Sequence, residues 1–187
     1  MAAVVLYDAC VLHPAPLRDL LLRVARTGLF RAKLTNEILD ECFASILRER
    51  PDLNMASLDR TRRLMIDAVP DILVRNYAPL IVGLELPDPK DRHVLAAAIR
   101  SGAQTIVTFN LKDFPETVLA GYDIVADHPD VFLLRLLDLS PHALLAVLDE
   151  QAEVLRAPKM SVEDVLARLE VLGIAEFVSR VRDLRQG

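Results

Sequence analysis

Short apolar runs bounded by glycine, proline and acidic residues recur along the first 126 residues of the chain. The first run, residues 2–7, is apolar at almost every position rather than alternating, which is typical of a parallel strand covered on both faces. We predict strands there and at the other β-rich runs. Those runs are residues 30–34, 80–82, 105–109 and 123–126.

Helical patterns separate these runs. Amphipathic periodicity predicts helices at residues 17–27, 36–50 and 54–69. A fourth helix is expected from Pro89, with Asp88 as its N-cap and Gly102 as its left-handed C-cap. Alternation of strands and helices indicates a mainly parallel sheet with right-handed crossovers, which is an α/β fold.

Beyond residue 127 the periodicity is wholly helical. We expect a break at Pro158 and divide the chain into an α/β domain, residues 1–127, and an all-helical C-terminal extension, residues 128–187. The apolar stripe of the extension predicts packing on the domain, with a partner surface as the alternative. Helix-start signals in the extension are His128, Ser140 and Ser161.

Composition narrows the class of protein. Hydrophobic residues make up 52% of the chain, which is enough for a core and argues against disorder. The net charge of −5 argues weakly against a constitutive nucleic-acid scaffold, but it does not exclude a nuclease. No apolar run reaches about 18 residues, and the N-terminus looks like a strand rather than a signal peptide, so we expect a cytoplasmic protein without a membrane span. Cys10 and Cys42 are expected to be small buried hydrophobes.

Four acids fall at the ends of the predicted elements. Asp8 follows the first strand, Glu41 lies within the helix 36–50, Asp91 lies near a helix start, and Asp113 follows the strand 105–109. The carboxyl ends of parallel strands share one edge, where α/β folds place ligands. Crowded carboxylates are costly unless they are protonated or bridged by a cation, and oxygen ligands select Mg²⁺ or Mn²⁺. Such a site suits phosphodiester hydrolysis by an activated water.

Four segments of the chain match one known pattern: residues 4–12, 35–41, 87–98 and 106–114. Together they resemble the PIN domain family and, within it, the VapC-type toxin ribonucleases of toxin–antitoxin pairs. The resemblance implies a three-layer α/β sandwich and an endoribonuclease that depends on Mg²⁺ or Mn²⁺. It also implies an RNA substrate, frequent homodimers and a small cognate antitoxin. VapC-type toxins are usually shorter than this chain, and the C-terminal helices depart from their pattern.

The resemblance implies that Asp8, Glu41 and Asp91 are the metal-binding acids of the family. For the fourth acid, some relatives use the position of Asn110 and others the position of Asp113. We favour Asp113 as the fourth catalytic and metal-binding acid, with Thr108 and Asn110 as hydrogen-bonding support.

Two neighbouring acids are alternatives for this set. Asp88 could replace Asp91, although it looks like a helix cap, and Glu37 could replace Glu41, because the two share one helix face. His13 and His93 lie near the predicted site, and we expect surface or supporting roles for both, since an all-carboxylate site does not need them.

Three arginines lie on the polar face of the helix 17–27. They could form an ordinary solvated face or contact substrate phosphate beside the loop after Asp8. We carry them forward as candidate substrate-binding residues: Arg18, Arg23 and Arg26.

Other functions also deserve comparison with the sequence. Haloacid-dehalogenase phosphatases need a second aspartate two residues after the first, where this chain has Cys10. A phosphoacceptor receiver domain needs further acids beside Asp8, and Lys112 is a weak candidate for its lysine. A non-catalytic PIN-fold module that binds RNA or protein is the remaining alternative.

Overall fold

A four-stranded parallel sheet lies at the centre of the computed structural model, which describes residues 2–155 and 159–186. The strand order is β2-β1-β3-β4, and every neighbouring pair is parallel. This arrangement confirms the predicted α/β class. The strands are β1 (Val4–Tyr7), β2 (Arg31–Lys33), β3 (Thr105–Val107) and β4 (Val125–Asp127).

The central strand β1 sets the position of the residues that follow it. Leu6 pairs with Lys33 of β2 and with Ile106 of β3. At the end of the ladder, the backbone N–H of Asp8 donates to the carbonyl of Val107 at 3.1 Å. The segments after β1 and β3 therefore leave the sheet side by side.

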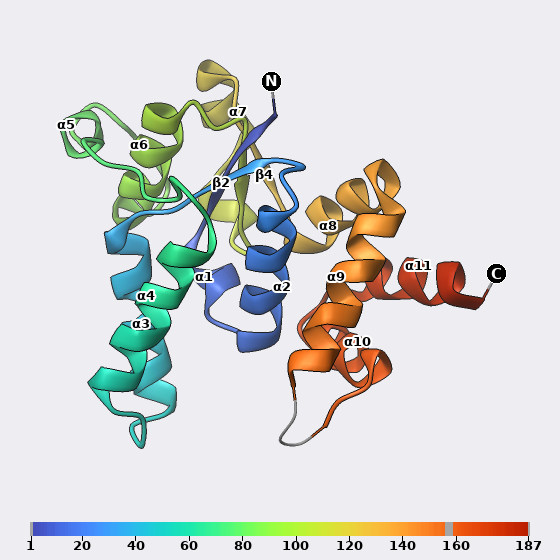
Figure 1. Cartoon of the computed structure of the whole chain (residues 1–187). Coiled ribbons are helices and arrows are strands. Elements are labelled where there is room, and N and C mark those ends of the chain that lie inside the picture. The colour runs from blue at the N-terminus through green and yellow to red at the C-terminus, as the bar shows by residue number, and fades with distance from the viewer. Residues whose placement is uncertain (1, 156–158, 187) are drawn as a thin grey trace.

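Helices cover both faces of the sheet (Figure 1). The helix α6 packs against β1 and β3, whereas α2 lies against β2 on the other side. The helices of this part are α1 (Ala9–Leu12), α2 (Ala15–Arg26), α3 (Asn36–Glu49), α4 (Met55–Ala68), α5 (Ala78–Ile81), α6 (Arg92–Ser101) and α7 (Glu116–Leu119). Short 3₁₀ turns are η1 (Pro89–Asp91), η2 (Leu111–Asp113) and η3 (Ala120–Tyr122).

An aromatic cluster fixes the end of β1. Tyr7 is fully buried, and its ring meets Phe30 and Phe132 edge-on, with centroids 6.3 and 6.5 Å away. Its hydroxyl donates to the carbonyl of Leu21 in α2 at 3.1 Å, which satisfies the one polar atom of a buried side chain. Asp8, the next residue, is therefore held on a rigid support.

The C-terminal helices pack on α2. Gln151 of α9 donates to the carbonyl of Pro16 at 2.9 Å, and Glu150 pairs with Arg23 at 2.7 Å. The predicted break at Pro158 lies outside the described residues, and a domain boundary at residue 127 stays a prediction. The four helices are α8 (Pro129–Leu139), α9 (Pro141–Val154), α10 (Val162–Val171) and α11 (Ala175–Gln186).

No single helix within residues 2–155 and 159–186 is long and apolar enough to cross a membrane. The helices α8 and α9 reach that length and composition only together, as a pair bent by 118°.

The strand predicted at residues 80–82 is wrong. This run lies in α5 and its C-cap, where Pro79 stands in the first helical turn and presets a helical φ. Val82 is 91% exposed, so the run does not contribute a buried strand. Asp88 is a cap, as predicted, but it caps the turn η1, and α6 begins only at Arg92.

Asp130 ties the last helix to α8, and its loss is expected to destabilise the fold. The buried carboxylate accepts hydrogen bonds from the backbone N–H groups of Glu176 and Phe177 at 3.0 and 2.8 Å. Asp130→Ala leaves the start of α11 uncapped and should lower the free energy of unfolding by about 1–2 kcal/mol. Urea denaturation measures the change. Asp138→Ala, at an exposed position of the same helix, should change stability far less.

Candidate active site

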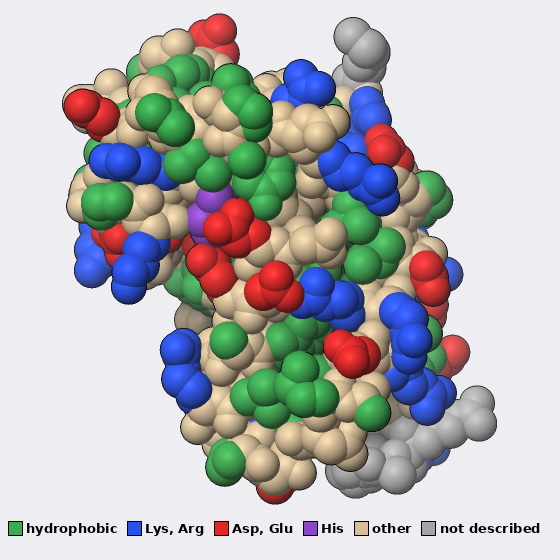
Figure 2. All heavy atoms as spheres, turned by 90° about the vertical axis from the view of Figure 1, so that its left-hand side faces the viewer, with side chains coloured by type: hydrophobic (Ala, Val, Ile, Leu, Met, Phe, Trp, Pro, Cys, Tyr) green, Lys and Arg blue, Asp and Glu red, His purple; other side chains and the backbone are tan. Residues whose placement is uncertain are grey.

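A hollow of about 330 Å³ opens beyond the carboxyl ends of β1 and β3. Three of the four predicted acids line it: Asp8 after β1, Glu41 from α3, and Asp91 from η1. Asn110, from the segment after β3, completes this part of the wall. Figure 2 shows acidic side chains gathered beside a histidine near the middle of one face, with basic and apolar side chains around them.

Asp8 is the most rigidly held of these acids. It is only 6% exposed, and its Oδ1 accepts the backbone N–H of Ala9 at 2.7 Å. Its Oδ2 accepts the hydroxyl of the fully buried Thr108 at 2.7 Å. The backbone N–H of Asn110 in turn donates to the Thr108 hydroxyl at 2.9 Å. The predicted supporting residues Thr108 and Asn110 therefore connect the end of β3 to Asp8.

Cys10 is a further partner of Asp8 that the sequence did not indicate. Its Sγ lies 3.1 Å from Asp8 Oδ2 and accepts the N–H of Phe109 at 3.2 Å. Burial and the charge of Asp8 raise the pKa of the Cys10 thiol to about 12, so at neutral pH it is a donor and not a thiolate nucleophile. The prediction of a plain buried hydrophobe is confirmed for Cys42 but is wrong for Cys10, which is partly exposed in the hollow.

Glu41 is paired with a buried histidine. His93 of α6 is 4% exposed, and its Nε2 lies 3.1 Å from Glu41 Oε1. Glu37, one turn earlier on the same face of α3, lies 3.7 Å from Nδ1 of that ring and accepts the hydroxyl of Tyr77 at 3.0 Å. Burial tends to lower the pKa of His93, but the hydrogen bond and charge of Glu41, with the charges of Glu37 and Asp8, outweigh it and raise the pKa.

The carboxylates interact electrostatically. The pKa of Asp91 is raised from its ordinary value of 3.8 to about 6. Burial is the largest cause, and the negative charges of Asp8, Asp88, Asp113 and Glu41 add to it. The negative charges of Asp8, Glu41 and Asp113 are therefore near enough to Asp91 to disfavour its ionised form.

The fourth predicted acid, Asp113, lies near Asp91 but does not line the hollow. The charge of Asp113 raises the pKa of Asp91, yet Asn110 rather than Asp113 lines the wall. Asp88, the alternative for Asp91, accepts the N–H of Lys90 at 2.9 Å and does not line the wall.

The donor set of the hollow fits a hard divalent cation. Carboxylate oxygens of Asp8, Glu41 and Asp91, with the amide oxygen of Asn110, are the ligand types that Mg²⁺ and Mn²⁺ prefer. Within the described parts of the chain, no three His, Cys, Asp or Glu side chains lie close enough together to hold one ion. The acids surround one hollow without converging on a point.

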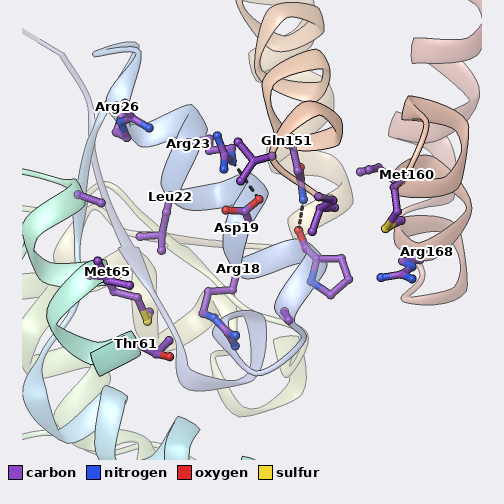
Figure 3. Close-up of a pocket in the computed structure, with 17 residues that line it drawn as sticks. Arg18, Asp19, Leu22, Arg23, Arg26, Thr61, Met65, Gln151, Met160 and Arg168 are labelled. Carbon is purple, nitrogen blue, oxygen red and sulfur yellow. Dashed lines mark hydrogen bonds and ion pairs between the residues drawn. The ribbon is translucent and has the colours of Figure 1, made fainter. Parts of the chain in front are cut away.

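The three candidate arginines line a different cavity, of about 470 Å³, between α2, α4 and the C-terminal helices (Figure 3). Arg18 donates to the carbonyls of Leu12 and His13 at 2.7 and 3.1 Å, which braces the loop after α1. Arg23 pairs with Asp19 at 2.9 Å and with Glu150, which Arg26 also approaches at 3.4 Å. Contact between these three arginines and a substrate therefore stays a prediction.

The raised pKa of Asp91 predicts a pH dependence of stability in metal-free buffer. Because the folded pKa of about 6 exceeds the unfolded value of 3.8, the unfolded chain loses this proton first as the pH rises. The ionised side chain therefore destabilises the fold increasingly between about pH 4 and 6, by about 1 kcal/mol after allowance for its partial exposure.

Asp91→Asn should accordingly gain stability relative to the parent chain over that interval and hold the gain above it. Urea denaturation of both proteins at pH 4.5, 5.5 and about 7 with EDTA present measures the difference. A difference that stays constant with pH would contradict the raised pKa.

Comparison with known proteins gives two family matches. The PIN domain family matches residues 4–112, which is more than half of the chain, and the VapC50 C-terminal domain family matches residues 129–183. A curated protein of Mycobacterium tuberculosis named "Putative ribonuclease VapC50" is 43% identical over 97 residues. That alignment covers 51% of this chain and 56% of the relative, so just over half of the relative's length is matched. No solved structure matches the chain.

Proposed function

We propose that this chain, which belongs to the PIN domain family, is an endoribonuclease that depends on Mg²⁺ or Mn²⁺ and acts as the toxin of a toxin–antitoxin pair. The observation that carries the proposal is the shared hollow of Asp8, Glu41 and Asp91 beyond the ends of the parallel strands. The relative named "Putative ribonuclease VapC50" supports the same activity. The match to the VapC50 C-terminal domain family supports the VapC-type assignment.

In this proposal Asp8, Glu41 and Asp91 hold the cation, and Asp113 acts as the fourth acid. A divalent cation bound there supplies charge stabilisation at a phosphodiester and lowers the pKa of the attacking water. Thr108 and Cys10 keep Asp8 oriented through the hydrogen bonds to its Oδ2. With both cysteine thiols protonated at neutral pH, neither serves as a nucleophile.

The partners proposed for the protein are an RNA substrate, a small cognate antitoxin and a second copy of the chain. The helices from residue 128 onward are proposed as an extension that packs on the PIN domain, which agrees with the bonds from Gln151 and Glu150 to α2. Arg18, Arg23 and Arg26 stay candidates for RNA contact through the edge of the larger cavity.

Growth of a bacterial host tests the toxin assignment. Expression of the wild-type chain alone should arrest growth, and co-expression of the small protein encoded beside it should relieve the arrest. Total RNA from arrested cells should contain discrete cleavage products. Growth without arrest, with soluble folded protein in the cells, would contradict the toxin assignment and leave the ribonuclease activity to be tested in vitro.

A non-catalytic PIN-fold module that binds RNA or protein is the competing function. The observation in its favour is that no three described acidic, histidine or cysteine side chains converge on one point. One assay distinguishes the two functions. A ribonuclease shortens a labelled RNA in the presence of Mn²⁺, whereas a binding module changes the electrophoretic mobility of the RNA without shortening it.

A further inference from the structure

We propose that His93 is a positioning residue that holds Glu41 at the edge of the acid hollow. This inference rests on the proposed function, because it concerns the carboxylate that the function assigns to cation binding. It assigns to a buried histidine a role that an all-carboxylate site does not require.

The geometry around the ring is specific. The side chain of His93 is buried at 4% exposure, and Nε2 lies 3.1 Å from Glu41 Oε1. A carboxylate only accepts hydrogen bonds, so Nε2 carries the proton and donates to Glu41. The bond joins α6 to α3 across 52 residues of sequence, and it comes from a helix that packs directly on the sheet.

The other ring nitrogen, Nδ1, faces a second carboxylate, that of Glu37. Within residues 2–155 and 159–186, Nδ1 of His93 is buried without a hydrogen-bond partner, and the nearest carboxylate oxygen there, of Glu37, lies 3.7 Å away. That oxygen is occupied by the hydroxyl of Tyr77 at 3.0 Å. Glu37 and Glu41 stand one turn apart on α3 and repel each other. Tyr77 therefore restrains Glu37 while His93 restrains Glu41, and the two acids are held in different places.

A carboxylate with a side-chain exposure of 45% would otherwise sample many rotamers. Fixing it in advance reduces the conformational entropy that cation binding costs, which is the usual effect of a hydrogen bond to a metal-binding side chain. His93 thus acts through Glu41 and does not need to touch the cation or the RNA.

Three substitutions of His93 separate positioning from packing. His93→Gln places an amide donor near the position of Nε2, whereas His93→Leu keeps bulk and removes the donor. His93→Asn keeps an amide that is too short to reach Glu41. His142→Gln, at an exposed position of α9, is the matched control.

The readout is the dissociation constant for Mn²⁺, measured from the electron paramagnetic resonance signal of free Mn²⁺, with thermal unfolding measured in parallel. We expect His93→Leu and His93→Asn to weaken Mn²⁺ binding about ten- to a hundredfold. His93→Gln should remain within about threefold of wild type, because the donor is retained. His142→Gln should bind as wild type does.

The outcomes distinguish the two proposals. If the wild-type chain binds no Mn²⁺, the proposed function fails. If wild type binds Mn²⁺ and the Asn and Leu variants bind it equally well, the function survives and the role of His93 is overturned. Equal weakening by Gln, Asn and Leu would also overturn it, because only packing would then matter. If His93→Leu does not fold, the comparison of Gln with Asn gives the same decision.

Discussion

Asp8→Asn is expected to reduce RNA cleavage at least about a thousandfold, equivalent to about 4 kcal/mol of transition-state stabilisation, while the chain stays folded. The substitution removes the buried negative charge at the end of β1 and keeps the size of the side chain. Thr108 and Cys10, which donate to Asp8 Oδ2, can rotate their hydrogens toward other acceptors, so the local hydrogen bonds adapt. The initial rate of cleavage of a labelled RNA in Mn²⁺ measures the effect.

The matched control is Asp88→Asn. Asp88 also contributes negative charge near Asp91, but it caps a 3₁₀ turn and does not line the hollow. Its variant should keep cleavage within a few fold of wild type. Equal activity of Asp8→Asn and Asp88→Asn would show that Asp8 has no role beyond local charge.

Chelation of divalent ions is expected to have the second large effect. EDTA should abolish RNA cleavage, and added Mn²⁺ or Mg²⁺ should restore it, because the proposed chemistry needs a cation among the carboxylates. The same ions should raise the thermal midpoint of wild type, since they offset the burial and the negative charges that raise the pKa of Asp91. Asp91→Asn should show a much smaller rise. Cleavage that persists in EDTA would contradict the proposed mechanism.

Much of the fold could be predicted from local signals. The continuous apolar run before Asp8 forms the central strand β1, and Thr35 caps α3 by accepting the N–H of Ile38 at 3.0 Å. Ser161 and Asp164 form the capping box that begins α10. These features depend on residues close in sequence, and for that reason the pattern of the chain is enough to indicate them.

Other features depend on contacts that no local pattern contains. The run at residues 80–82 is as apolar as a strand, but no strand in the described part of the chain pairs with it, and Pro79 favours a helical turn. The bond between His93 and Glu41 joins residues 52 apart, and the approach of Cys10 to Thr108 joins residues 98 apart.

The most direct test of the account is a crystal structure of the wild-type chain with Mn²⁺, with the ion located by its anomalous scattering. The account predicts an ion in the hollow, ligated by carboxylate oxygens of Asp8, Glu41 and Asp91. An anomalous peak elsewhere, or none at millimolar Mn²⁺ with these side chains ordered around the hollow, would contradict it.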